Sequence, residues 1–175
     1  MSNIGKVTLA HLSVKEYLLF SNQLHECSTP HFHINEKLAH ELISQTCLGY
    51  LLQLDSYDSV TSQEIAKFPL PHYAAEFWIF HAHAGGSDDL TSLKKLTVKL
   101  FQSDHFPFLN WIQLWDADDK WGRKNKSTSP LYYAALLGLQ EVAQELIRTN
   151  MNLNIQGGYY GNTLQAASCK GYDAM

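Results

Sequence analysis

The last third of the sequence repeats itself with a period of 33 residues, and this repeat constrains the fold more than any other feature. The repeated positions are Leu131, Ala134 and Gly138 in the first copy, and Leu164, Ala167 and Gly171 in the second. The alanines let two antiparallel helices approach closely, and the glycine allows a tight turn between them. A period of this length predicts one helix–turn–helix unit per copy.

The first copy also matches a known pattern. Residues 129–138 read SPLYYAALLG and resemble the T-P-L-H-x-A-A-x-x-G pattern of ankyrin repeats, in which Leu131 anchors the helix pair. Leu153 and Asn154 resemble the V-N that ends such a unit. The apolar residues of the expected second helix are Val142, Leu146 and Ile147.

The second copy departs from that pattern. It carries Thr163 where the first has Pro130, it has Gln165 where a histidine is usual, and the sequence reaches Met175 before a second helix. The resemblance therefore implies that residues 126–175 hold ankyrin repeats, one complete and one truncated. Because a stable stack usually needs three or more repeats, we expect this one to rest on the preceding region.

Composition excludes several classes of protein. The chain has 175 residues and a formal net charge of −4, so it lacks the basic footprint of a protein that binds nucleic acid or an anionic membrane. The longest run without polar side chains is residues 130–139, far short of the ~20 that a membrane-spanning helix needs. Three cysteines without a CxxC pair, and no signal-peptide pattern, predict a cytoplasmic protein.

The region before the repeat has the pattern of a helical spacer. Apolar spacing and end signals predict helices over residues 35–52, 71–85, 88–101 and 106–115. Asn35 is the expected N-cap of the first, Pro71 suits the first turn of the second, and Gly85-Gly86 ends it. The polar stretch 116–128 is the best domain boundary. The predicted fold is all-α: an irregular helical spacer over residues 26–125, followed by the helix–turn–helix repeat.

The first 25 residues suggest a family. Residues 7–12 alternate weakly, as a short β element would, and Ser13 with Glu16 forms a capping box. Residues 9–18, LAHLSVKEYL, resemble the motif that closes the winged helix of NACHT-type signalling ATPases, above all the fungal members that carry a C-terminal ankyrin array. Residues 34–52 and 69–81 resemble segments of the same proteins.

That resemblance implies a role for one residue and a missing part. In the family, the motif's histidine contacts bound ADP, and His11 holds the matching position. The sequence contains no G-x-x-x-x-G-K-[ST] loop, so we expect ADP or ATP only in the intact architecture, with the ATPase core upstream, and no cofactor in this chain. From the residues alone, His11 is equally a residue at the end of a strand.

Metal and catalytic constellations are weak. His31 and His33 could share one side of an extended segment, whereas His81 and His83 would diverge on a helix, and neither pair has further ligands at an established spacing. Cys27 lies near two histidines without a local signature of a nucleophile. We therefore predict no metal site and no catalytic residue.

These observations predict a non-enzymatic segment that links a nucleotide switch to a partner-binding ankyrin array. The alternative is a part of a NACHT-type ATP-dependent enzyme in which His11 senses ADP. The expected partner is a protein, with no nucleic acid and no membrane. Fold geometry nominates partner-binding residues at the turn tips and on the first helix: Arg123, Lys124, Asn125, Tyr132, Tyr133, Leu136, Tyr159 and Tyr160.

Overall fold

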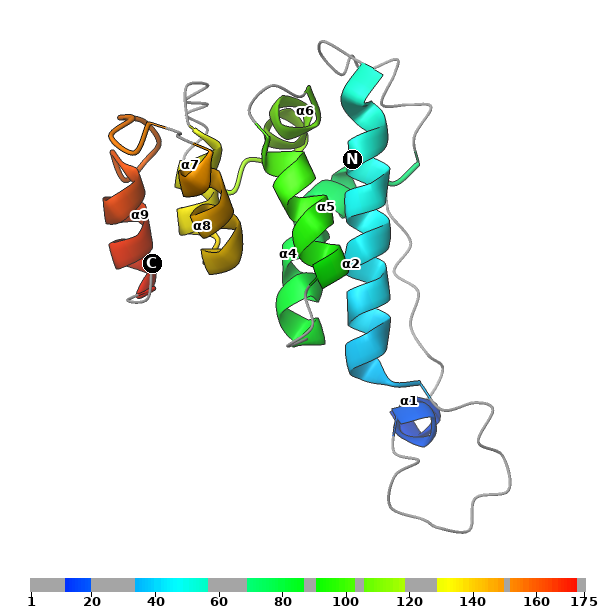
Figure 1. Cartoon of the computed structure of the whole chain (residues 1–175). Coiled ribbons are helices and arrows are strands. Elements are labelled where there is room, and N and C mark those ends of the chain that lie inside the picture. The colour runs from blue at the N-terminus through cyan, green and yellow to red at the C-terminus, as the bar shows by residue number, and fades with distance from the viewer. Residues whose placement is uncertain are drawn as a thin grey trace.

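The chain folds into a series of packed helices that follow one another across the molecule (Figure 1). The computed structural model describes residues 12–19, 34–56, 69–86, 91–102, 106–118, 129–149 and 152–172. Within these ranges the only extended pairing is an isolated antiparallel bridge between Gln156 and Asn162. The predicted all-α fold is therefore confirmed.

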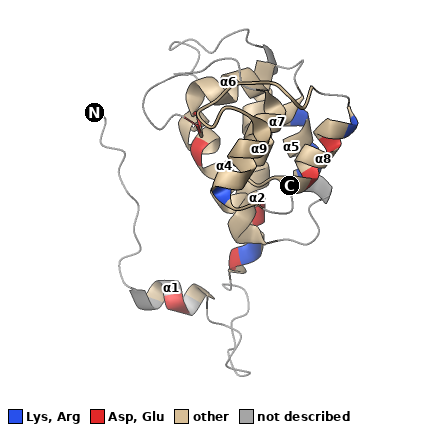
Figure 2. Ribbon diagram, turned by 90° about the vertical axis from the view of Figure 1, so that its left-hand side faces the viewer, with Lys and Arg blue, Asp and Glu red and all other residues tan. Residues whose placement is uncertain are grey.

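The helices, in chain order, are α1 (Leu12–Leu19), α2 (Glu36–Leu52), α4 (Pro71–Gly85), α5 (Thr91–Phe101), α6 (Phe106–Leu114), α7 (Pro130–Leu136), α8 (Gln140–Arg148) and α9 (Thr163–Lys170), with a 3₁₀ turn η2 (Gln53–Ser56) after α2. Figures 1 and 2 show α1 standing apart from the others. This helix already includes Ser13, which the sequence placed before it as a cap, and the predicted β element over residues 7–11 lies outside the described residues.

Several helix ends follow from local sequence. The Asn35 side chain accepts a hydrogen bond from the Leu38 amide at 3.2 Å and caps α2. Pro71 occupies the first turn of α4, and Gly86 ends that helix in the left-handed conformation, with φ 56°. Close packing then joins α2 to α4, because a Cβ on Gly85 would lie 3.3 Å from the Glu41 backbone nitrogen.

Buried aromatic rings make the centre of the fold. Trp78 on α4 lies 6.0 Å from Trp111 on α6, centroid to centroid, and both are completely buried. The Trp111 indole N–H donates to the Ala75 carbonyl at 3.0 Å, which ties α6 to α4. Trp111 also lies 5.6 Å from Tyr133 on α7, so the core runs on into the repeat region across the predicted boundary. Trp111 thus covers the first unit, as the sequence suggested.

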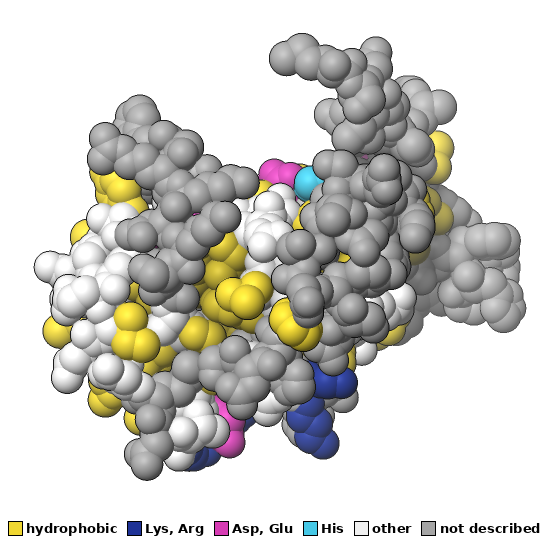
Figure 3. All heavy atoms as spheres, turned by 90° about the horizontal axis from the view of Figure 1, so that it is seen from above, with side chains coloured by type: hydrophobic (Ala, Val, Ile, Leu, Met, Phe, Trp, Pro, Cys, Tyr) yellow, Lys and Arg dark blue, Asp and Glu magenta, His cyan; other side chains and the backbone are white. Residues whose placement is uncertain are grey.

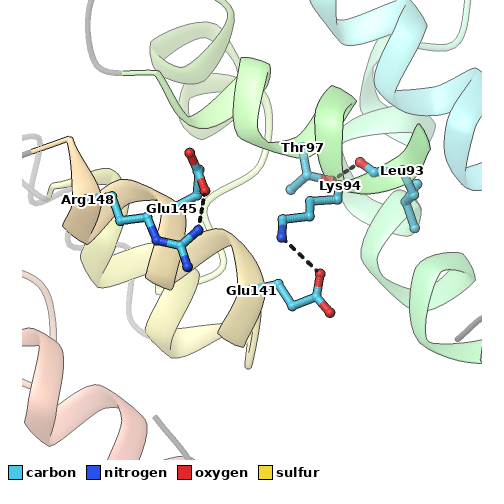
Figure 4. A network of polar contacts seen from close by, with 6 residues as sticks. All are labelled: Leu93, Lys94, Thr97, Glu141, Glu145 and Arg148. Atoms are coloured by element: carbon cyan, nitrogen blue, oxygen red, sulfur yellow. Dashed lines mark hydrogen bonds and ion pairs between the residues drawn. The ribbon is translucent and has the colours of Figure 1, made fainter. Parts of the chain in front are cut away.

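A second connection joins the spacer to the repeat region at the surface. Figure 4 shows Lys94 of α5 reaching toward Glu141 at the start of α8, with 3.3 Å between Nζ and Oε2. Within α8, Arg148 pairs with Glu145 at 3.0 Å. Both pairs are largely exposed and contribute little to stability, about 0–1 kcal/mol each. They orient α8 beside α5 while burial holds it in place.

Candidate protein-interaction site

The sequence repeat is also a repeat of structure, beginning with the caps of α7 and α9. The Ser129 hydroxyl oxygen accepts from the Tyr132 amide at 3.2 Å and begins α7. Asn162 stands 33 residues later, and its side-chain oxygen accepts from the Gln165 amide at 2.9 Å. Each copy therefore starts its first helix with a side-chain cap at the same position.

The two helices end alike as well. Gly138 follows α7 with φ 70°, and Gly171 follows α9 with φ 73°. After each glycine the chain folds back: the Leu139 amide donates to the Ala134 carbonyl at 2.9 Å, and its counterpart donates to Ala167 at 3.1 Å. This pattern closes a helix and turns the chain into the next segment. In the first copy that segment is α8, which packs back on α7.

The copies differ in how their repeated leucine is covered. Leu131 is 2% exposed, whereas Leu164 is 71% exposed. Helix α9 packs against α7, so α7 is enclosed between α8 and α9. Because the same residue type sits at the same helical position in both copies, the exposure of Leu164 reflects what covers each helix rather than its sequence.

An apolar groove opens beside Leu164. Its volume is about 340 Å³, and it lies between α8 and α9 with α7 as its floor. The apolar lining consists of Leu131, Ala135, Ala143, Ile147, Leu153, Leu164 and Ala167. Of the described residues that line it, the polar ones are uncharged: Gln140, Gln144, Asn154 and Thr163. Seen from above, hydrophobic and uncharged side chains cover the left part of Figure 3, the end that carries α7, α8 and α9.

The turn before α9 is fastened to the rest of the molecule through one tyrosine. The Tyr132 hydroxyl donates to the Asp118 carboxylate at 2.9 Å and accepts from the Tyr160 amide at 3.3 Å. The other oxygen of Asp118 accepts from the Tyr159 amide. Burial is the main cause that raises the pKa of Tyr132, so the phenol stays protonated and keeps donating.

Three of the proposed partner-binding residues serve the core instead. Tyr132, Tyr133 and Leu136 are each at most 3% exposed, which corrects the expectation that they face a partner. The physical reason is that α7 is enclosed by its neighbours, and the Tyr133 hydroxyl is satisfied by donating to Asp116 at 2.6 Å.

The remaining proposed residues divide into two groups. Tyr159 is exposed and Tyr160 half-buried in the turn before α9. His11, Arg123, Lys124 and Asn125 lie outside the described residues, as do the pair His31 and His33 and the candidate nucleophile Cys27. Sequence reasoning missed Ile147, Leu153 and Leu164 as surface candidates. The available signal was the repeat itself, since a leucine whose copy lacks its second helix is left uncovered.

The one histidine of the candidate pairs that has a close partner meets a different residue. His81 Nδ1 lies 2.7 Å from His40 Nδ1, and His81 Nε2 lies 2.9 Å from the Tyr73 hydroxyl. The ring centroids of the two histidines are 4.9 Å apart, so the nitrogens face one another as in a hydrogen bond rather than toward a shared ion. In the described part of the chain, no group of three or more His, Cys, Asp or Glu is placed to hold a metal.

A second apolar face covers α2 and α4. Phe80 is 58% exposed and lies against the His40 ring, with 5.8 Å between centroids. Tyr73 and Phe77 continue this face along α4, and Leu42 is exposed on α2. In contrast to the α8–α9 groove, no described cavity is recorded at this face, so its shape selects a partner less sharply.

Comparison with known proteins gives one informative relative. The chain is 34% identical over 181 aligned positions to "Azaphilone pigments biosynthesis cluster protein L" of the fungus Monascus ruber. The alignment covers 94% of this chain but 38% of that protein, so the chain spans well under half the length of its relative. No protein-family model matches the chain, and no solved structure does either.

This relative corrects the family suggested by the sequence. The resemblance to NACHT-type ATPases with an ankyrin array is wrong, because the match over nearly the whole chain is to a pigment-cluster protein. The motifs behind that resemblance are short, and an alanine-rich helix followed by glycine is what any close helical hairpin requires. The ADP-sensing role of His11 loses its basis with the family. Separately, none of the described helices is long and apolar enough to cross a bilayer.

Proposed function

We propose that this chain is a non-enzymatic protein-interaction segment of a secondary-metabolism protein, and that its partner binds in the groove between α8 and α9. The observation that carries the proposal is the 71% exposure of Leu164 beside an apolar groove of about 340 Å³. Large apolar side chains that gather at a hollow rather than singly mark interaction sites. A role in the assembly of proteins that make a pigment-like product is favoured by the similarity to the Monascus ruber protein.

The proposal is tested by photo-crosslinking in the cells that produce the protein. A benzophenone amino acid replaces Leu164 in one variant and Leu109, 46% exposed on α6, in the control. We expect a discrete protein adduct from position 164 and none from position 109. Equal adducts from both positions, or no protein adduct from position 164, would overturn the proposed function.

A further inference from the structure

The groove has a template for its occupant within the same chain. Helix α8 covers α7 with the apolar residues Val142, Ala143 and Leu146, all buried, and turns its charged residues outward. Since α9 repeats α7 in its cap, its glycine turn and its buried alanine, the uncovered side of α9 is the surface that α8 covers on α7. A helix placed on α9 as α8 lies on α7 would run beside α8 and fill the groove.

We infer that the groove binds an amphipathic helix of the partner protein in the manner of α8 on α7; this rests on the proposed function. The small residues Ala135, Ala143 and Ala167 in the lining allow the backbone of an incoming helix to approach closely. Such a helix buries apolar side chains at positions i, i+4 and i+7 or i+8.

Charge narrows the partner further. The described polar residues in the lining are amides and a hydroxyl, which hydrogen-bond but do not compensate an ionised group. An ionised side chain buried there would be unpaired and costly. The contacting face of the partner helix is therefore apolar and uncharged, with its charges on the opposite face, as Glu141 and Glu145 are on α8.

The test uses α8 itself as the probe. A fluorescent peptide of residues 139–149, with a hydrocarbon staple replacing Glu141 and Glu145 on its exposed side, is titrated with the intact chain and followed by anisotropy. The staple is needed because so short a helix is marginal in water. The control peptide carries Val142→Asp and Leu146→Asp on the same staple.

We expect the stapled peptide to bind the unmodified chain and the control peptide to bind at least about tenfold more weakly. Leu164→Asp should weaken binding of the α8 peptide at least about tenfold, whereas Leu109→Asp should leave it unchanged. Both leucines are exposed, so neither change threatens folding, and circular dichroism of each variant checks this.

Three results would overturn the inference. They are no binding of the stapled peptide up to about 1 mM, equal binding by the Leu164→Asp variant, or a dimer in sedimentation that Leu164→Asp dissociates and the peptide does not. A protein adduct from position 164 in cells together with any of these would leave the proposed function standing and refute the helical partner alone.

Discussion

The Tyr132 hydroxyl donates a hydrogen bond to the Asp118 carboxylate at 2.9 Å, although the two residues lie on opposite sides of a polar stretch that reads as a domain boundary. This contact joins the end of the helical spacer to α7. Because Asp118 also accepts from the Tyr159 amide, the same carboxylate holds the turn that leads into α9. The position of the groove therefore depends on a bond made outside it.

The first prediction concerns this bond. Tyr132→Phe and Asp118→Ala should each destabilise the chain, and the double variant should lose less than the sum. A hydrogen bond to a charged group contributes about 1.5–3 kcal/mol, so we expect a coupling free energy of about 1–3 kcal/mol. Urea denaturation of the four proteins of the cycle measures it. Additive losses would show that the two side chains do not stabilise one another.

The second prediction compares the repeated leucines. Leu131→Ala removes a buried side chain and should lower the free energy of unfolding by about 2–5 kcal/mol. Leu164→Ala, at the same position of the second copy, should change it by less than about 0.5 kcal/mol because the side chain is exposed. Denaturant titration of both variants checks the difference. Similar losses would mean that Leu164 is covered in solution.

The third prediction concerns Gly158, which has φ 72° and whose added Cβ would overlap the Tyr132 ring. Gly158→Ala should therefore destabilise the chain by backbone strain and by displacement of that ring, about 2–4 kcal/mol in all. Gly86→Ala is the matched control, since Gly86 has φ 56° and open space around it, and only the strain of about 1 kcal/mol applies. Thermal unfolding of the two variants separates the contributions, and equal losses would contradict the steric one.

Local sequence predicted the helices and their ends well, because these depend on neighbours in the chain. Asn35, Pro71 and Gly86 do in the structure what their residue types favour at helix ends. The all-α class and the contact of Trp111 with the first unit followed from the same reasoning.

The candidate site was predicted less well because it depends on contacts across the chain. The pattern around Leu131 and the pattern around Leu164 are alike, and only the packing of α8 and α9 on α7 distinguishes a buried leucine from an exposed one. Tyr132 looked like a surface residue because its partner Asp118 belongs to a segment whose composition indicates a linker. The family inference failed for a related reason, since the helical-hairpin pattern reports close packing and not ancestry.

The last prediction concerns pH and the pair formed by His40 and His81. Burial, and then the nearby His40, lower the pKa of His81, so the folded chain binds fewer protons there than the unfolded chain, whose histidines titrate near ~6.5. Stability is therefore undiminished by this site above about pH 6.5 and falls as the pH drops below that value toward the lowered pKa. A second proton would also set two N–H groups against each other across the 2.7 Å contact. We expect the urea midpoint to fall between about pH 7.5 and 5.5. His81→Gln should reduce that fall, whereas His83→Gln, an exposed residue on the same helix, should leave it as in the unmodified chain. An unchanged fall in the His81→Gln variant would place the pH-sensitive group elsewhere.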